Sequence, residues 1–257
     1  MNTREKFTAL RTIVTKEILR FSRIWIQTVL PPMITTALYF VIFGNLIGPR
    51  IGDMEGFRYM EFIIPGLIMM AVITNSYANV VSSFYGSKFQ RHIEEMLVAP
   101  VPYYIIVLGF TSGGVTRGLT CGIAVTAVSL VFSPLNIHSL VVMLSMILLT
   151  AILFSLAGLI NGVYAKTFDD ISIIPTFVLT PLTYLGGIFY SISMLPDFWQ
   201  HVSLANPILY MINAFRYGFL GVSDISLAAS YSISIGFILA LYALSIYLLH
   251  KGQGIRT

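Results

Sequence analysis

Apolar residues in this chain gather into long runs instead of the alternating or three-to-four-residue patterns of a soluble domain. A helix needs roughly 20 mainly apolar residues to cross a bilayer, and six runs approach or exceed that length. They lie at residues 24–48, 62–85, 105–135, 140–164, 171–190 and 227–249. The pattern predicts an all-α polytopic membrane protein that forms one domain over residues 1–257 and has six transmembrane helices.

Residues 1–23 have a different pattern. Five apolar residues recur there at three- and four-residue steps, with Arg and Lys between them: Phe7, Leu10, Val14, Ile18 and Phe21. That spacing puts the apolar side chains on one face of a helix. Because the intervening positions are basic, we expect an amphipathic helix that lies on the membrane surface before the first span.

A further helical segment is expected before the last run. Residues 206–221 are apolar but short for a span, begin with Asn-Pro and include Arg216. Together with residues 194–205 they are predicted to form a re-entrant helical pair on the outer side of the membrane. Arg216 is expected near the outer interface, paired with Asp197 or Asp224.

The distribution of charge predicts an orientation. Charged residues make up only 10% of the chain and the mean hydropathy is +0.84, so lipid is the solvent for most of it. Six Lys and Arg residues precede the first run, whereas the loop after it has Arg50 and Arg58, offset by Asp53 and Glu55. The positive-inside rule therefore places the N-terminus in the cytoplasm, and six spans return the tail with Arg256 to the same side.

The sequence favours transport over catalysis or nucleic-acid binding. The net charge of +4 comes from basic residues at the edges of apolar runs, not from a phosphate-binding stripe. A phosphate-binding loop ends in Gly-Lys followed by Ser or Thr, and the sequence has no Gly-Lys dipeptide. The four histidines have no metal-ligand spacing. We therefore expect no catalytic residue, no metal site and no nucleotide held by this chain.

Polar residues inside the second run have two open interpretations. Asn75, Asn79, Ser82 and Ser83 form a stripe at helical spacing. Such groups are unfavourable against lipid, so they line a transport pathway or make hydrogen bonds between helices. Glycines at four-residue steps, such as Gly114, Gly118 and Gly122, are typical of close helix packing.

The stretch from Ser87 to Pro100 concentrates charge between the second and third runs. It predicts a short helix that ends before Pro100 and has an apolar side formed by Phe89, Ile93, Met96 and Leu97. A helix resting on anionic lipid favours lysine over glutamate, yet this one carries Glu94 and Glu95. Mixed charge around an apolar ridge suits a groove on a protein partner better.

Two motifs resemble those of a known family. Arg91 followed by Glu94, Glu95, Leu97 and Pro100 resembles the cytoplasmic segment of type-2 permease subunits of ATP-binding cassette (ABC) exporters. A second group resembles that family's extracellular signature: Gly186, Gly187, Phe189, Leu195, Pro196, Asn206, Pro207 and Arg216. Two positions depart from the family pattern, because His92-Ile93 replaces the usual Gly-Thr and Ser191 stands where proline is frequent.

The resemblance implies a permease subunit in the bacterial inner membrane that forms a homodimer. It further implies a separate ABC ATPase subunit, which binds ATP and Mg²⁺ and contacts the permease at a coupling helix. The residues that would make this contact are Arg91, Ile93, Glu94, Glu95, Leu97 and Pro100. The alternative is a secondary transporter driven by an ion gradient, a class that tends to carry acidic residues inside its spans.

Overall fold

Long apolar runs favour helices in a bilayer, because a helix satisfies its backbone hydrogen bonds within one segment. The computed structural model describes residues 1–252, and five of its helices are long and apolar enough to cross a membrane. They are Trp25–Ile51, Tyr59–Phe89 (α4), Tyr103–Phe132 (α6), Leu140–Tyr164 (α7) and Leu227–Lys251 (α12). The chain is a helical polytopic membrane protein, as the runs predict.

The first of these spans is composite. It begins with α2 (Trp25–Tyr39), continues as a π-helical segment (Phe40–Ile47) and ends in α3 (Gly48–Ile51). Pro31 and Pro32 lie inside α2, where they cannot donate backbone hydrogen bonds to the preceding turn.

The run at 171–190 forms a shorter helix than expected. Its three segments have five residues each: α8 (Asp170–Ile174), a π-helical turn (Pro175–Leu179) and α9 (Thr180–Tyr184). Fifteen residues extend about 22 Å, against roughly 30 Å for the hydrocarbon layer. The helix ends before Gly187, whose φ of +76° suits glycine and turns the chain. The count of six spans therefore stays a prediction.

Three short helices connect this segment to α12: a 3-10 turn (Ile192–Met194), α10 (Asp197–Leu204) and α11 (Pro207–Leu220). The first turn of α11 packs near Gly186, and its last turn packs against Met143 at the start of α7. Its 14 residues extend about 21 Å. The two segments predicted as a helical pair are therefore helices, and α11 is too short to cross the hydrocarbon layer of roughly 30 Å.

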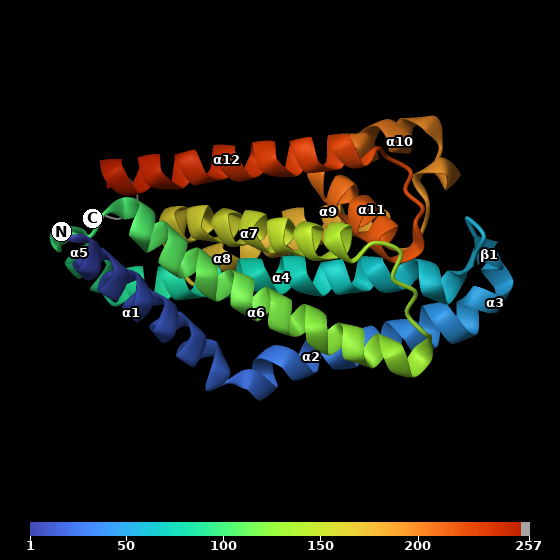
Figure 1. Ribbon diagram of the computed structural model, residues 1–257, viewed down its shortest axis with the longest axis horizontal. Coiled ribbons are helices and arrows are strands. Elements are labelled where there is room, and N and C mark those ends of the chain that lie inside the picture. Colours follow the sequence, from blue (N-terminus) through green and yellow to red (C-terminus); the bar gives the residue numbers. More distant parts are fainter. Residues whose placement is uncertain (253–257) are drawn as a thin grey trace.

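The long helices lie side by side along the longest dimension of the molecule (Figure 1). At one end, the α5 end, are the N-terminus, the described end of the chain and α5 (His92–Val98). At the other, the hairpin end, strands β1 (Asp53–Met54) and β2 (Phe57–Arg58) pair antiparallel. Both ends of the described chain thus lie at the same end of the bundle. The tail with Arg256, which was expected on the side of the N-terminus, lies outside the described residues.

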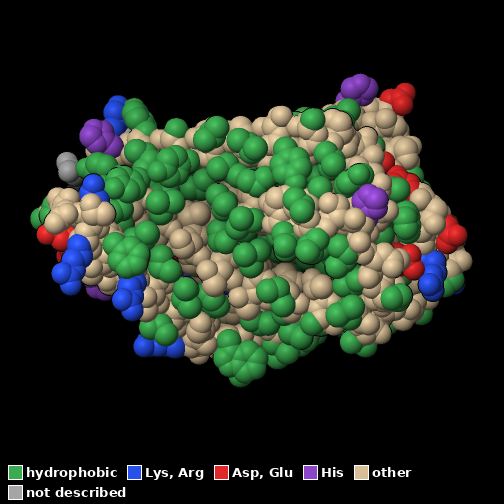
Figure 2. Space-filling model, viewed as in Figure 1, with side chains coloured by type: hydrophobic (Ala, Val, Ile, Leu, Met, Phe, Trp, Pro, Cys, Tyr) green, Lys and Arg blue, Asp and Glu red, His purple; other side chains and the backbone are tan. Residues whose placement is uncertain are grey.

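The central helix is α4, which is buried along most of its length. Glycines let its neighbours approach closely: a side chain at Gly118 of α6 would overlap the Ser76 hydroxyl, and one at Gly158 of α7 would lie 2.5 Å from the carbonyl oxygen of Tyr77. The glycine steps in the sequence are therefore packing positions. On the visible face, hydrophobic side chains cover the middle of the bundle and charged side chains gather at its two ends (Figure 2).

The N-terminal helix α1 (Thr3–Ser22) starts with a capping box between Asn2 and Glu5. Its buried residues are Ile13, Glu17 and Phe21, so the packed face is not centred on the apolar stripe seen in the sequence. Phe7, a member of that stripe, is 66% exposed. The helix packs against α6, with Ile13 next to Gly109 and Glu17 next to Gly113.

Candidate functional site

The turn between α4 and α5 is tightly held to the bundle. Arg91 adopts a left-handed conformation, with a φ of 61°, and reverses the chain into α5. One turn earlier, the Lys88 ammonium donates to the carbonyl oxygens of Val163 and Ala165, each at 2.7 Å. Carbonyls at a helix C-terminus lack partners within the helix, so Lys88 caps α7. The Lys88 ammonium therefore makes hydrogen bonds within the bundle and does not contribute to a contact with a partner protein.

The side chains of α5 divide into a buried and an exposed set. Ile93 is fully buried in a core cluster, against which Met96 and Leu97 also pack. Ile93 thus fastens α5 to its own bundle, which corrects the expectation that it contacts a partner. Glu95 and Pro100 are exposed and Glu94 is half-buried.

Two apolar side chains are exposed beside this helix: Phe89, which belongs to the predicted apolar side, and Val98, which does not. Val98 is 87% exposed and Phe89, at the end of α4, is 64% exposed. Arg91, Glu95 and Pro100 are exposed in the same stretch, and we call the five exposed residues Phe89, Arg91, Glu95, Val98 and Pro100 the α5 surface. It combines apolar contact area with charges of both signs.

The polar stripe of α4 meets cationic side chains from two other helices. Arg20 of α1 donates to Asn79 Oδ1 at 2.7 Å and to Ser82 Oγ at 3.4 Å. Arg117 of α6 donates to Asn75 Oδ1 at 3.3 Å. Hydrogen bonding between helices therefore accounts for much of the stripe.

A buried carboxylate lies next to this stripe. Glu17 of α1 accepts a hydrogen bond from Ser83 at 2.6 Å, and its oxygens lie 3.5 Å from Arg20 Nε and 3.9 Å from Lys16 Nζ. Among residues 1–252, Glu17 and Arg216 are the charged side chains that are buried. Glu17 thus has two cationic neighbours and one hydroxyl donor. Nothing in the sequence indicated that this carboxylate would be buried.

A cavity of about 340 Å³ lies between α2, α4 and α6. Asn75 and Arg117 supply polar groups to its wall, and Thr28, Thr35 and Thr74 supply hydroxyl groups. Leu67, Met70 and Ala71 form an apolar part of the wall. Of the four stripe residues, Asn75 lines this cavity, so both interpretations of the stripe apply to that residue.

The residues of the predicted extracellular motif come together at the hairpin end of the bundle. The Arg216 guanidinium is buried, donates to the Gly187 carbonyl oxygen and lies 3.9 Å from the centre of the Phe62 ring. A side chain at Gly186 would lie 2.9 Å from Ile212, so glycine permits α11 to approach. The hydrogen bond from Arg216 therefore connects α11 to the turn that follows α9.

Asn206 and Pro207 start α11 as a cap and a first-turn proline. The Asn206 side chain accepts from the Ile208 N–H at 3.0 Å and donates to the Leu182 carbonyl oxygen at 2.6 Å. Proline is favoured in the first turn because it lacks a donor that the helix does not need there. Leu195, Pro196 and Phe189 are structural as well: Leu195 accepts from Gln200, Pro196 precedes α10, and Phe189 stacks on Tyr184.

Arg216 does not pair with Asp197 or Asp224 in the described part of the chain, which corrects that expectation. Asp224 instead accepts from the Ser191 hydroxyl at 2.8 Å, and its N–H donates to the Asn213 side chain at 3.1 Å. Ser191, one of the two departures from the family pattern, thus has a specific hydrogen-bond partner.

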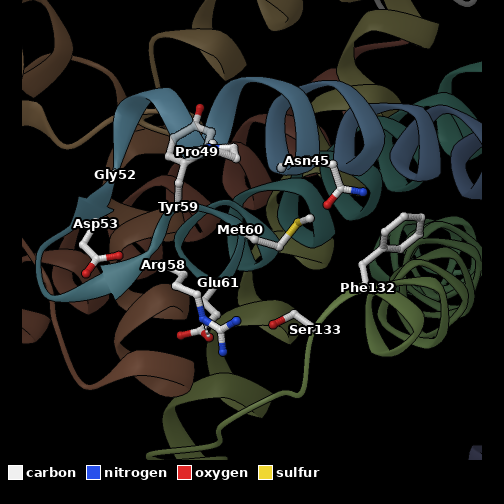
Figure 3. Close-up of a pocket in the computed structure, with 12 residues that line it drawn as sticks. Asn45, Pro49, Gly52, Asp53, Arg58, Tyr59, Met60, Glu61, Phe132 and Ser133 are labelled. Carbon is white, nitrogen blue, oxygen red and sulfur yellow. Dashed lines mark ion pairs between the residues drawn. The ribbon is translucent and has the colours of Figure 1, made fainter.

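A second hollow, of about 350 Å³, opens at the hairpin end (Figure 3). Asn45, Asp53, Glu61 and Ser133 contribute polar groups, and Arg58 Nε lies 3.2 Å from Glu61 Oε1. Arg58 is already paired there. No group of three metal-ligating side chains occurs within residues 1–252.

Comparison with known proteins gives a consistent result. The model of the family described as "ABC-2 type transporter" matches residues 8–220. The Escherichia coli protein named inner membrane transport permease YadH is 62% identical over 249 residues, which cover 97% of each chain. Nodulation protein J of Rhizobium meliloti is 24% identical over 204 residues, 79% of this chain and 78% of the relative.

Proposed function

The chain belongs to the ABC-2 type transporter family, and from this membership we propose that it is the membrane-spanning permease of an ATP-driven exporter in a bacterial inner membrane. Two copies form the transport path as a homodimer, and separate ATPase subunits bind ATP and Mg²⁺. The transport class rests on the family and on the inner-membrane permease that is 62% identical to this chain.

The observation that carries the coupling mechanism is the α5 surface. It lies between two long helices, at the end where both described chain ends lie, and it presents Phe89 and Val98 beside Glu95 and Arg91. Exposed charges fix the orientation of a contact more than they add affinity, and exposed apolar groups supply adhesion.

Movement of this surface is transmitted into the bundle through existing contacts. Ile93 is buried in the inner core and Lys88 is bonded to the end of α7. When an ATPase pair closes on ATP, a pull on α5 therefore acts on α4 and α7 together. ATP favours one of two arrangements of the bundle because it binds the closed ATPase pair better than the open one.

The test replaces the two exposed groups that a partner would contact. Glu95→Lys with Val98→Lys is expected to leave insertion and dimer formation intact, and to lower ATP-driven export at least tenfold by weakening ATPase binding. The matched control is Ile51→Lys with Asp53→Lys, an apolar and an acidic residue exposed at the hairpin end. Co-purification with the ATPase and transport in proteoliposomes report both effects. Normal coupling in the α5 variant would refute the proposal.

The second candidate is a transporter driven by an ion gradient, which would use a carboxylate inside a span. The buried carboxylate of Glu17 lies instead on α1, which is not one of the five candidate spans. The contacts from Arg20 and Ser83 account for this carboxylate structurally. Proteoliposomes with a proton or sodium gradient and without the ATPase distinguish the two: uptake under those conditions favours the second candidate.

A further inference from the structure

Arg117 lies near the middle of a membrane-spanning helix. It follows Tyr103, the first residue of α6, by 14 residues and precedes the last, Phe132, by 15. At 1.5 Å per residue it is more than 20 Å from either end. One turn earlier, Gly113 packs against Glu17 near the end of α1, and one turn later, Cys121 Sγ lies 3.6 Å from the Thr28 carbonyl oxygen near the start of the first span. Arg117 therefore lies at the level where the first span begins, and its long side chain can reach the polar interface there.

The charge of Arg117 has no acidic partner in the described part of the chain. The ion pairs of residues 1–252 link Lys16 and Arg20 to Glu17, and Arg58 to Glu61. The contact that Arg117 makes is with the neutral Asn75 side chain, and its buried Nε has no hydrogen-bond partner. A guanidinium beside a membrane-spanning bundle that has no acidic partner is a candidate counter-ion for an anionic ligand.

The cavity beside Arg117 has room for the missing partner. Its volume of about 340 Å³ falls within the range of small-ligand sites. Gln27, Pro31, Thr35 and Thr74 line it and are exposed, so the cavity opens at the side of the bundle. Leu67, Met70 and Ala71 add an apolar wall.

We infer that this cavity binds the anionic, phosphate-type head of an amphiphile, with Arg117 as its counter-ion and the apolar wall against its chain. A guanidinium holds such an oxyanion through two parallel hydrogen bonds. Thr35 and Thr74 add hydroxyl groups that hydrogen-bond its oxygens. If the bound amphiphile is the transported substrate, the inference rests on the proposed transport function. The existence of the binding site does not depend on that function.

Binding is tested with the purified full-length chain in neutral maltoside micelles. Dodecyl phosphate is expected to bind saturably by calorimetry, and dodecyltrimethylammonium, dodecanol and inorganic phosphate at least tenfold more weakly. Arg117→Gln should weaken dodecyl phosphate binding at least tenfold, and Arg117→Lys less. The control Arg23→Gln removes an exposed guanidinium four residues before Gln27 and should change binding less than twofold.

A cavity-filling variant, Thr74→Leu, keeps the charge and should also abolish binding. Absence of saturable binding, or equal affinity of Arg117→Gln and the unaltered chain, overturns the inference. So does binding of inorganic phosphate as tight as that of dodecyl phosphate.

Two lipid nanodiscs distinguish the source of the head. Binding of dodecyl phosphate that is lost in phosphatidylglycerol discs but kept in phosphatidylcholine discs assigns the site to an anionic bilayer phospholipid, which competes for it. Binding that is kept in both discs assigns the site to an amphiphile other than the bilayer lipid. Both results support an anionic-head site. The assay needs no ATPase, so its failure leaves the proposed ATP coupling untouched, and a failure of ATP to drive transport leaves the site untouched.

Discussion

The contact between α4 and α7 offers a direct test of the packing. At Gly158, an added methyl group would lie 2.5 Å from the Tyr77 carbonyl oxygen and 3.3 Å from two further backbone atoms of Tyr77. A favourable contact is roughly 3.5 Å, so Gly158→Ala forces the two helices apart by about 1 Å. Because the opposing atoms belong to the backbone, no flexible side chain can relieve the clash.

The magnitude follows by comparison with a glycine that has free space. Gly236 in α12 would place an added methyl group with nothing within 4 Å. Both alanine variants gain helix propensity of up to about 1 kcal/mol, and this gain cancels in the comparison. What remains is the overpacking at Gly158, about 1–3 kcal/mol. A 2 kcal/mol difference corresponds to roughly 4–8 °C in Tm for a chain of this size.

The assay measures the Tm of both variants in the same detergent, together with the midpoint of SDS-induced unfolding. We expect Gly158→Ala to unfold several degrees below Gly236→Ala, with Gly236→Ala at or above the unaltered protein. Equal stability of the two variants would refute the close approach of α7 to α4, and with it the glycine-packing argument.

Three further outcomes are expected. Lys88→Met should destabilise the fold by about 1.5–3 kcal/mol, because it removes the charge-assisted hydrogen bonds to the end of α7. Amide hydrogen exchange at the end of α7 measures this effect: exchange should be faster in Lys88→Met and return to the rate of the unaltered protein in Lys88→Arg. Backbone N–H groups of Lys166 and Thr167 donate to Asp170 and hold its pKa below the ordinary value. The unaltered protein should therefore have a higher Tm than Asp170→Asn at a pH above the ordinary pKa of aspartate. This difference in Tm should disappear as the pH falls through the lowered pKa. In a Cys121→Ser background, an impermeant maleimide should label Ser193→Cys in intact cells but Thr3→Cys only after permeabilisation. Labelling of Thr3→Cys in intact cells would contradict the predicted orientation, and protection of both residues in intact cells would contradict a span at residues 171–190.

Much of the architecture could be read from the sequence because the bilayer imposes a local rule. A segment must be apolar over about 20 residues and helical to enter it, and five of the six predicted runs are helices of that kind. The exception, residues 171–190, contains Pro175 and Pro181 and turns at Gly187. Apolar composition alone does not reveal where such a helix ends.

The motif residues were found by resemblance, whereas their contacts depended on the fold. Arg216 is a conspicuous charge in an apolar stretch, but its partners are a backbone carbonyl and an aromatic face, which leave no mark in the sequence. Ile93 belongs to a pattern that predicts an apolar ridge, yet the turn at Arg91 points it into the bundle.

Sequence by itself therefore determined the membrane class, the long helices, the glycine packing faces and the short charged helix, since each depends on residues close together along the chain. Tertiary structure alone decided which polar groups meet. Glu17 and Ser83 are 66 residues apart, Arg117 and Asn75 42, and Arg216 and Gly187 29. A buried charge is stable only where the fold supplies its partners, and those partners come from helices that become neighbours when the bundle assembles.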